Sequence, residues 1–157
     1  MATNRDFNDL FCAFNAHDVR YLVVGAYAVT FHARPRFTQD LDLWVDPEPE
    51  NSHRVLAALA SFGAPVRDLK AVELARPGLV VQLGVAPNRI DVLTGVEGLS
   101  FSEAWPARVA ANYSGTPIHV IGREHLIRNK RALGRPQDLL DVQELERSPD
   151  RPPGAPP

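Results

Sequence analysis

The sequence predicts an α/β fold in which a small mixed sheet of about five strands is flanked by helices, with a helical C-terminal segment. Short apolar stretches bounded by glycine or proline, such as 20–24 and 38–45, alternate with stretches of helical periodicity. Two further apolar stretches, 78–83 and 89–93, follow each other closely, as expected for paired strands. Alternating helices and strands with a strand pair in the middle are typical of an α/β sandwich.

Length and composition are consistent with one globular domain. The chain has 157 residues with 45% hydrophobic content and a net charge of −2, so no global field favours binding to nucleic acid. We expect a single domain over residues 1–147, with its helical C-terminal part at about 122–147, and a disordered tail over 148–157, where five of ten residues are proline. No signal pattern and no long apolar run is present, which predicts a cytoplasmic protein without a membrane partner.

Apolar spacing and helix breakers define the elements of the first half. Phe7, Phe11 and Phe14 recur at helical spacing and predict one packed helix face. Pro35 breaks the second helix, because proline disfavours helical geometry in the residue before it, and Gly63 marks the end of the third. The expected elements are a helix at 4–17, a strand at 20–24, a helix at 26–33, a strand at 38–45 and a helix at 49–62.

The second half is less regular. A short helix is favoured near 68–74 within an ambiguous stretch, and the turn-like 86–88 joins two strands. Residues 101–113 carry only a weak signal, and Gly134-Arg135-Pro136 separates the last two helices. The expected elements are strands at 78–83, 89–93 and 116–121, followed by helices at 122–132 and 136–146.

Asp40 and Asp42 are the most informative residues. On a strand, side chains two residues apart point to the same face, roughly 6.6–7 Å apart along it. Two such carboxylates can share hard cations such as Mg²⁺. Asp91, between apolar residues on another predicted strand, would complete a three-carboxylate site, because a carboxylate there is costly unless paired or metal-bound. The simpler alternatives are solvated carboxylates at a strand end and, for Asp91, a salt bridge with Arg89 on its own face.

A glycine and a basic segment supply the means to hold phosphate. Gly25 ends the first predicted strand, fifteen residues before Asp40, and permits a ligand to approach the backbone closely. The amides that open the next helix can then cradle an anion. The acidic stretch 38–50 and the basic stretch 122–135 suit a metal and a polyphosphate, although two separately solvated faces would give the same pattern.

Three motifs together resemble a known family. They are Gly25-Ala26, then Arg36-x-Thr38-x-Asp40-x-Asp42-Leu43-Trp44-Val45, then Ile90-Asp91-Val92-Leu93. They are similar to the minimal nucleotidyltransferases of the polymerase-β superfamily, above all to the AbiEii-like or MNT-like group linked to bacterial toxin–antitoxin loci. The resemblance covers roughly residues 20–95 and extends more loosely to Leu126-Ile127-x-x-Lys130 and Arg135-x-x-Asp138-x-x-Asp141.

The resemblance implies a metal-dependent enzyme that transfers a nucleoside monophosphate from an NTP to a hydroxyl group of a protein, an RNA or a small molecule. Its cofactor would be Mg²⁺ or Mn²⁺, and an antitoxin or another protein is a candidate partner. By this resemblance Asp40, Asp42 and Asp91 would be catalytic and bind the metal. The nucleotide-binding residues that it implies are Gly25, Ala26, Arg36, Thr38 and Lys130.

Ala26 departs from the family pattern, which commonly has Ser or Gly at this position. A hydroxyl that would contact phosphate is therefore missing, and a nucleotide-binding or regulatory module with weak or no turnover is a second hypothesis. A metal-dependent sugar transferase, in which Asp-x-Asp also occurs, is a third. Lys130 could equally lie on a solvated face, and Asp138 and Asp141 are expected to pair with Arg135 or other surface bases.

Overall fold

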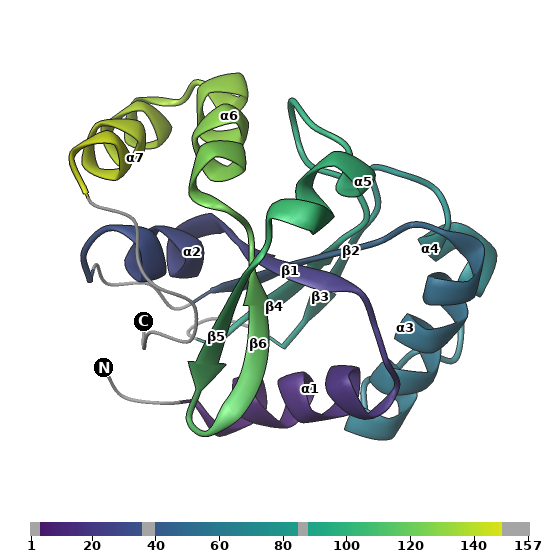
Figure 1. Ribbon diagram of the computed structural model, residues 1–157. Coiled ribbons are helices and arrows are strands. Elements are labelled where there is room, and N and C mark those ends of the chain that lie inside the picture. The colour runs from purple at the N-terminus through teal and green to yellow at the C-terminus, as the bar shows by residue number, and fades with distance from the viewer. Residues whose placement is uncertain (1–3, 36–39, 85–87, 149–157) are drawn as a thin grey trace.

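A central mixed sheet organises the chain, and its strand order is β3-β4-β2-β1-β6-β5 (Figure 1). The computed structural model describes residues 4–35, 40–84 and 88–148. This confirms the predicted α/β class, with six strands in the described part where about five were expected. The strands are β1 Tyr21–Val24, β2 Leu41–Val45, β3 Val80–Leu83, β4 Ile90–Leu93, β5 Val109–Tyr113 and β6 Thr116–Val120.

Helices cover both faces of the sheet. In Figure 1, α1 and α3 lie on one side and α2, α6 and α7 on the other. Within the described ranges, no helix is both long and apolar enough to span a membrane. The helices are α1 Arg5–Ala16, α2 Gly25–His32, α3 Pro49–Phe62, α4 Ala71–Leu74, α5 Phe101–Ala104, α6 Arg123–Leu133 and α7 Pro136–Arg147, with a 3₁₀ turn, η1, at Trp105–Ala107.

The two helices beneath the sheet have sequence-encoded ends. The side chain of Asn4 accepts hydrogen bonds from the first amides of α1, and the side chain of Glu48 does the same for α3. Gly63, at φ +96°, ends α3 in the left-handed conformation that glycine adopts without penalty. The predicted packed face of α1 is buried, as Phe7, Phe11 and Phe14 show.

Two strand predictions need correction. The weak stretch 101–113 contains β5, an edge strand that pairs antiparallel with β6 and buries only Ala111 and Tyr113 of its five side chains. Such a strand leaves little apolar pattern to detect. The strand predicted at 38–45 begins at Leu41, so Asp40 precedes β2, while residues 36–39 lie outside the described part of the chain.

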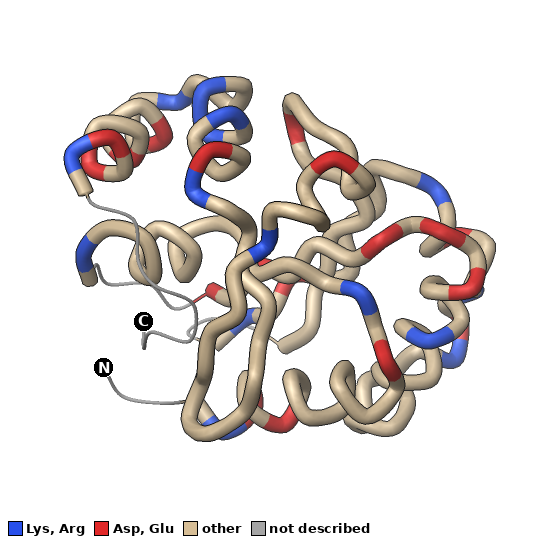
Figure 2. The backbone as a smooth tube through the Cα atoms, viewed as in Figure 1, with Lys and Arg blue, Asp and Glu red and all other residues tan. Residues whose placement is uncertain are grey.

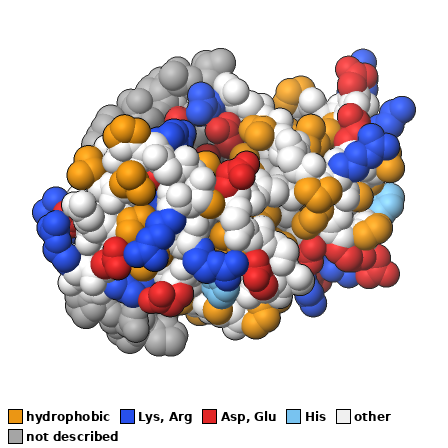
Figure 3. Space-filling model, turned by 90° about the horizontal axis from the view of Figure 1, so that it is seen from above, with side chains coloured by type: hydrophobic (Ala, Val, Ile, Leu, Met, Phe, Trp, Pro, Cys, Tyr) orange, Lys and Arg blue, Asp and Glu red, His pale blue; other side chains and the backbone are white. Residues whose placement is uncertain are grey.

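Charge is distributed without a dominant sign. Figure 2 shows basic and acidic positions on both α6 and α7, and Figure 3 shows Lys and Arg interspersed with Asp and Glu on the face seen from above. The two helices are joined by ion pairs, of which Arg131–Glu146, at 3.1 Å, is exposed on both sides. The basic segment predicted at 122–135 is thus partly neutralised by α7.

Candidate active site

The register of the sheet brings Asp42 and Asp91 together. β2 and β4 are adjacent parallel strands, and Asp42 is paired directly with Asp91. On the other side β1 runs antiparallel to β2, with Val24 opposite Asp42, so Gly25 follows at the same edge. Residues directly opposite each other on neighbouring strands point to the same face. The geometry required by the sequence hypothesis, Asp91 beside Asp42 next to the first glycine, is therefore present.

Gly25 is needed because Asp42 approaches it closely. Gly25 has φ +68°, in the left-handed region, and a Cβ added there would meet the carboxylate of Asp42, with Oδ2 as the nearest atom. The first turn of α2 starts at Gly25 without a side-chain cap, which leaves its amides available to a ligand. The backbone at the start of α2 and the carboxylate of Asp42 therefore lie next to each other.

A cavity of about 370 Å³ opens at this point. It is the place where the carboxylates, the glycine turn and two basic side chains come together. Lys130 lines it from α6 and Arg135 from the start of α7. Its lining residues are Val24, Gly25, Ala26, Asp40, Asp42, Leu93, Lys130, Leu133 and Arg135.

Of the eight residues that the sequence singled out, the described part of the chain includes six. Five of them line the cavity, and Asp91 is the paired neighbour of Asp42. Arg36 and Thr38 lie outside the described residues. Arg135 also lines the cavity, although the sequence pointed to it only as part of a basic segment and of a C-terminal motif, not as a nucleotide-binding residue.

The carboxylates perturb one another electrostatically. Burial, and then the neighbouring charges of Asp91 and Asp40, raise the pKa of Asp42 to about 6, while Lys130 and Arg89 oppose the shift. An ionised Asp42 is therefore only partly compensated by the protein itself. A site with this imbalance favours a bound cation.

Arg89 lies between two of the carboxylates. Its guanidinium is 3.2 Å from Asp40 and 3.2 Å from Asp91, measured from Nη2 to Oδ2 and from Nε to Oδ1. The salt bridge considered as a simple alternative for Asp91 is thus observed. Among the residues that the structure describes, no three His, Cys, Asp or Glu side chains are arranged so that they could hold a metal ion as they stand.

The residue types nevertheless suit a hard cation. Carboxylate oxygens are the ligands that Mg²⁺ and Mn²⁺ prefer, and Asp40 and Asp91 lie close enough to Asp42 to raise its pKa, although Arg89 pairs with both of them. The raised pKa of Asp42 marks where positive charge is lacking. A cation bound by Asp40 and Asp42 would compete with Arg89, which would have to withdraw from Asp40.

Lys130 is held by two buried carboxylates rather than lying on a solvated face. Its Nζ is 3.3 Å from Oδ1 of Asp138 and 3.2 Å from Oδ2 of Asp141, and all three side chains are buried. An ammonium group has three N–H donors, so two can face the aspartates while one remains for the cavity that Lys130 lines. Asp138 and Asp141 therefore hold the ammonium of Lys130 in position.

Asp138 also joins Arg135 to this network. Its Oδ2 accepts a hydrogen bond of 2.6 Å from Nε of Arg135, which confirms the expected pairing, but the carboxylate is buried instead of lying at the surface. Burial alone would raise the pKa of Asp138, yet the hydrogen bonds from Arg135 and Lys130 outweigh it and hold the pKa below its usual value.

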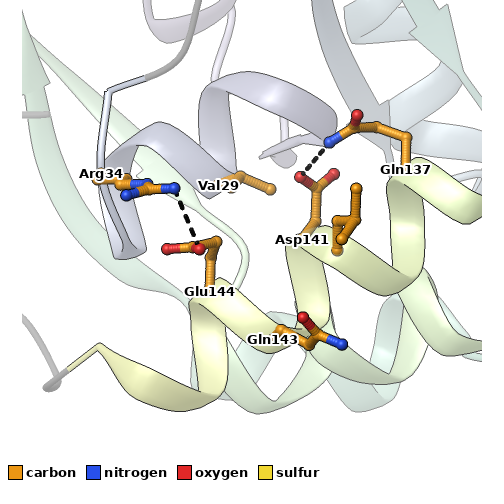
Figure 4. A pocket seen from close by; sticks show the side chains of 7 residues that line it. Val29, Arg34, Gln137, Asp141, Gln143 and Glu144 are labelled. Carbon is orange, nitrogen blue, oxygen red and sulfur yellow. Dashed lines mark hydrogen bonds and ion pairs between the residues drawn. The ribbon is translucent and has the colours of Figure 1, made fainter.

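A smaller cavity lies on the other side of Asp141 (Figure 4). It has about 230 Å³ and is bounded by Val29 of α2 and by α7. Gln137 donates a 3.0 Å hydrogen bond to Asp141, and Arg34 pairs with Glu144 at 3.2 Å. The first contact lies within α7, and the second joins α7 to Arg34, just after α2, so the helix that positions Lys130 is itself anchored at one point.

The buried pair of Asp138 and Lys130 makes a measurable prediction. Asp138→Asn is expected to lower the free energy of unfolding by about 3 kcal/mol, because it leaves the buried ammonium short of a counter-charge. The matched control is Glu146→Gln, which breaks an exposed pair between the same two helices and should cost less than about 1 kcal/mol. Urea unfolding at pH 7 measures both; equal losses would contradict this account.

Solved structures with the same fold are found, whereas no family model and no curated protein sequence matches the chain. The lincosamide antibiotic adenylyltransferase LnuA, in its lincomycin-bound structure, matches with a TM-score of 0.57 at 14% identity, over 92% of this chain and 97% of that one. TM1012 from Thermotoga maritima, assigned as a nucleotidyltransferase, gives 0.59 at 13%, over 91% of each chain. ANT(2")-Ia in complex with adenylyl-2"-tobramycin gives 0.57 at 14%, over 88% and 84%. The chain therefore shares the fold of these three structures over nearly its whole length.

Proposed function

We propose that the protein is a nucleotidyltransferase that moves a nucleoside monophosphate from an NTP to a hydroxyl group of an acceptor and releases pyrophosphate. The observation that carries this proposal is the pairing of Asp42 with Asp91 next to a cavity that Gly25, Asp42 and Lys130 line. Carboxylates, free amides and a fixed ammonium are the groups that phosphoryl transfer requires. The shared fold of the three nucleotidyltransferases supports the same reaction class.

Asp40 and Asp42 are the residues that would hold Mg²⁺ or Mn²⁺, with Asp91 as the third carboxylate. When bound, such an ion neutralises phosphate charge and favours attack at phosphorus. The chain's own residues do the rest of the positioning. The amides after Gly25 and the ammonium of Lys130 bind the phosphates, and Arg135 at the cavity edge adds a second positive group.

In this proposal Asp91 accepts the proton of the attacking hydroxyl. In the proposed reaction the acceptor oxygen forms a bond to the α-phosphorus, the bond from that phosphorus to the pyrophosphate oxygen breaks, and the hydroxyl proton passes to Asp91. Arg89 must release Asp91 for this role, because its guanidinium now pairs with that carboxylate. Membership of the AbiEii-like or MNT-like group, an antitoxin partner and a cytoplasmic location belong to the same proposal.

Asp91→Asn is the variant that tests the proposal most directly. It should leave binding of an NTP with Mg²⁺ within about threefold but reduce pyrophosphate release at least about a hundredfold, because the proton acceptor is lost. Calorimetric titration with each NTP and mass spectrometry of released pyrophosphate give the two readouts. Asp68→Asn, an exposed carboxylate away from the cavity, is the control and should match the wild type in both.

A nucleotide-binding module without turnover is the second candidate function, and two observations favour it. Ala26 lines the cavity where a serine hydroxyl would otherwise contact phosphate, and Arg89 occupies the space between Asp40 and Asp91. Under this hypothesis wild-type protein binds Mg²⁺ and NTP but releases no pyrophosphate with any acceptor. That result would replace transfer by binding as the conclusion.

A further inference from the structure

One guanidinium group bridges two of the three carboxylates at the candidate site. Nη2 of Arg89 lies 3.2 Å from Oδ2 of Asp40 and donates a hydrogen bond of 3.3 Å to Oδ2 of Asp91. Nε of the same side chain is 3.2 Å from Oδ1 of Asp91. A divalent ion held by this group of carboxylates would take oxygens of the same side chains as ligands. The guanidinium therefore contacts oxygens that a bound ion would use.

The contacts of Arg89 are those of a side chain that can withdraw. Charge-assisted N–H···O bonds are typically about 2.7–2.9 Å long, whereas these three contacts are 3.2 or 3.3 Å. Nε of Arg89 and Oδ1 of Asp91 are both buried, yet neither has a hydrogen-bond partner among the described residues, so their ion pair lacks hydrogen-bond geometry. The arginine side chain is 36% exposed, so it can turn towards solvent without crossing the core.

The backbone that carries this side chain is fixed in the sheet. The amide of Leu41 donates a 2.9 Å hydrogen bond to the carbonyl of Arg89, where β2 and β4 begin to pair. Asp91 is held in β4 by its register with Asp42. Release of the carboxylates therefore requires rotation about the side-chain bonds of Arg89 and no change in the sheet.

The single charge of Arg89 does not balance the carboxylates. Burial, and then the charges of Asp91 and Asp40, raise the pKa of Asp42 to about 6 although Arg89 opposes the shift. A divalent ion would compensate these groups better, but on entering alone it must break the contacts of the guanidinium. A triphosphate that arrives with the ion supplies further oxygen ligands for the ion and negative charge for the released guanidinium.

We propose that Arg89 forms an autoinhibitory contact: without nucleotide it holds Asp40 and Asp91 and lowers the affinity for divalent ions, and it is released when an ion and the phosphates of an NTP bind together. This inference rests on the proposed function and concerns when the site can be loaded. Two ligands that both favour the released state of one side chain bind cooperatively. Among the described residues, the carboxylates are not arranged to hold a metal ion as they stand, as expected while Arg89 holds them.

Binding of Mn²⁺ without nucleotide tests this contact, with EPR spectroscopy of the free ion as the readout. Arg89→Gln removes the competing charge and should bind Mn²⁺ at least about tenfold more tightly than the wild type. Arg89→Lys keeps the charge and should stay closer to the wild type. Arg54→Gln is the matched control, because it removes an arginine that pairs with Glu50 on α3, and it should change nothing. Equal affinities of the wild type and Arg89→Gln would overturn the inference.

The Nε–Hε signal of Arg89 gives a second readout in wild-type protein labelled with ¹⁵N-arginine, and its loss in Arg89→Gln assigns it. Mg²⁺ alone, at a concentration that saturates Arg89→Gln, should leave this signal in place. Mg²⁺ with a non-hydrolysable NTP analogue should move it. A signal that Mg²⁺ alone moves as far would contradict the cooperative release. An analogue that binds by calorimetry without moving the signal would overturn the inference alone, whereas one that does not bind would overturn the proposed function and the inference with it.

Discussion

Asp42→Asn is expected to abolish nucleotidyl transfer and, without divalent ions, to stabilise the protein. Transfer should fall at least about a thousandfold, because a ligand of the proposed cation is lost at the centre of the carboxylate group. Stability should change in the opposite direction, because the ionised Asp42 is buried beside two further carboxylates. A loss of function together with a gain in stability is typical of residues strained for a binding role.

The pH dependence of this stability gain has a defined sign. The pKa of Asp42 is raised from 3.8 when unfolded to about 6 in the folded protein. The folded state therefore binds the proton more tightly, and the contribution of Asp42 to stability is lost as the pH rises from about 4 through 6. At pH 7.5 the asparagine variant should recover up to about 3 kcal/mol, and at pH 4 almost none.

Thermal unfolding with and without Mg²⁺ tests two expectations for Asp42→Asn: the gain in stability without divalent ions and the loss of cation binding. In EDTA at pH 7.5 the variant should melt at the higher temperature. Saturating Mg²⁺ should raise the melting temperature of the wild type and leave the variant almost unchanged, because a cation that binds only the folded state stabilises it. An Asp68→Asn control should follow the wild type throughout. A variant that melts lower in EDTA would contradict the electrostatic account of Asp42.

Gly25→Ala is expected to have the second largest effect, because it combines backbone strain with displacement of Asp42. A left-handed φ costs an L residue roughly 1–2 kcal/mol, and the new Cβ would also meet the Asp42 carboxylate. Moving a catalytic carboxylate by about 1 Å can reduce the rate about a hundredfold, so transfer should fall by at least that factor.

Gly115→Ala separates strain from displacement. Gly115, in the turn between β5 and β6, has φ +85°, but a Cβ there would meet nothing within 4 Å. Both variants should therefore lose stability in urea unfolding, whereas only Gly25→Ala should lose transfer and binding of Mg²⁺ by calorimetry. Equal loss of transfer in Gly115→Ala would contradict a role for the contact between Gly25 and Asp42. Intact Mg²⁺ binding in Gly25→Ala would contradict it as well.

Local patterns were sufficient to predict most elements and the place of Asp42 on its strand. Asp42 and Gly25 could be related from sequence, because a strand, a glycine and a second strand of matching length predict neighbours. The parallel pairing of β2 with β4 brings Asp91 into register with Asp42. This pairing depends on a crossover of more than forty residues, so no local hydrophobic periodicity encodes it. Asp91 was predicted instead from the cost of a carboxylate between apolar strand residues, and the family resemblance pointed to the same residue.

The last helix shows why the Lys130 network could not be predicted in full. Asp138, Asp141, Val142 and Leu145 form one stripe at helical spacing and are all buried, while Leu139 and Leu140, at 47% and 54% exposure, face outward. A hydrophobicity pattern assigns the leucines to the core and the acids to solvent. The assignment is reversed because Lys130 on α6 pairs with both aspartates. The sequence of one helix alone does not indicate a pairing with another helix.

The ion pairs that hold α7 against α6 make this C-terminal helix part of the candidate active site rather than an appendage. A chain shortened at Gly134 would lose both counterions of Lys130, whose ammonium they hold in position at the cavity. Truncations should therefore keep α7 through Arg147, and evolutionary shortening of this helix should be rare among proteins that keep the lysine.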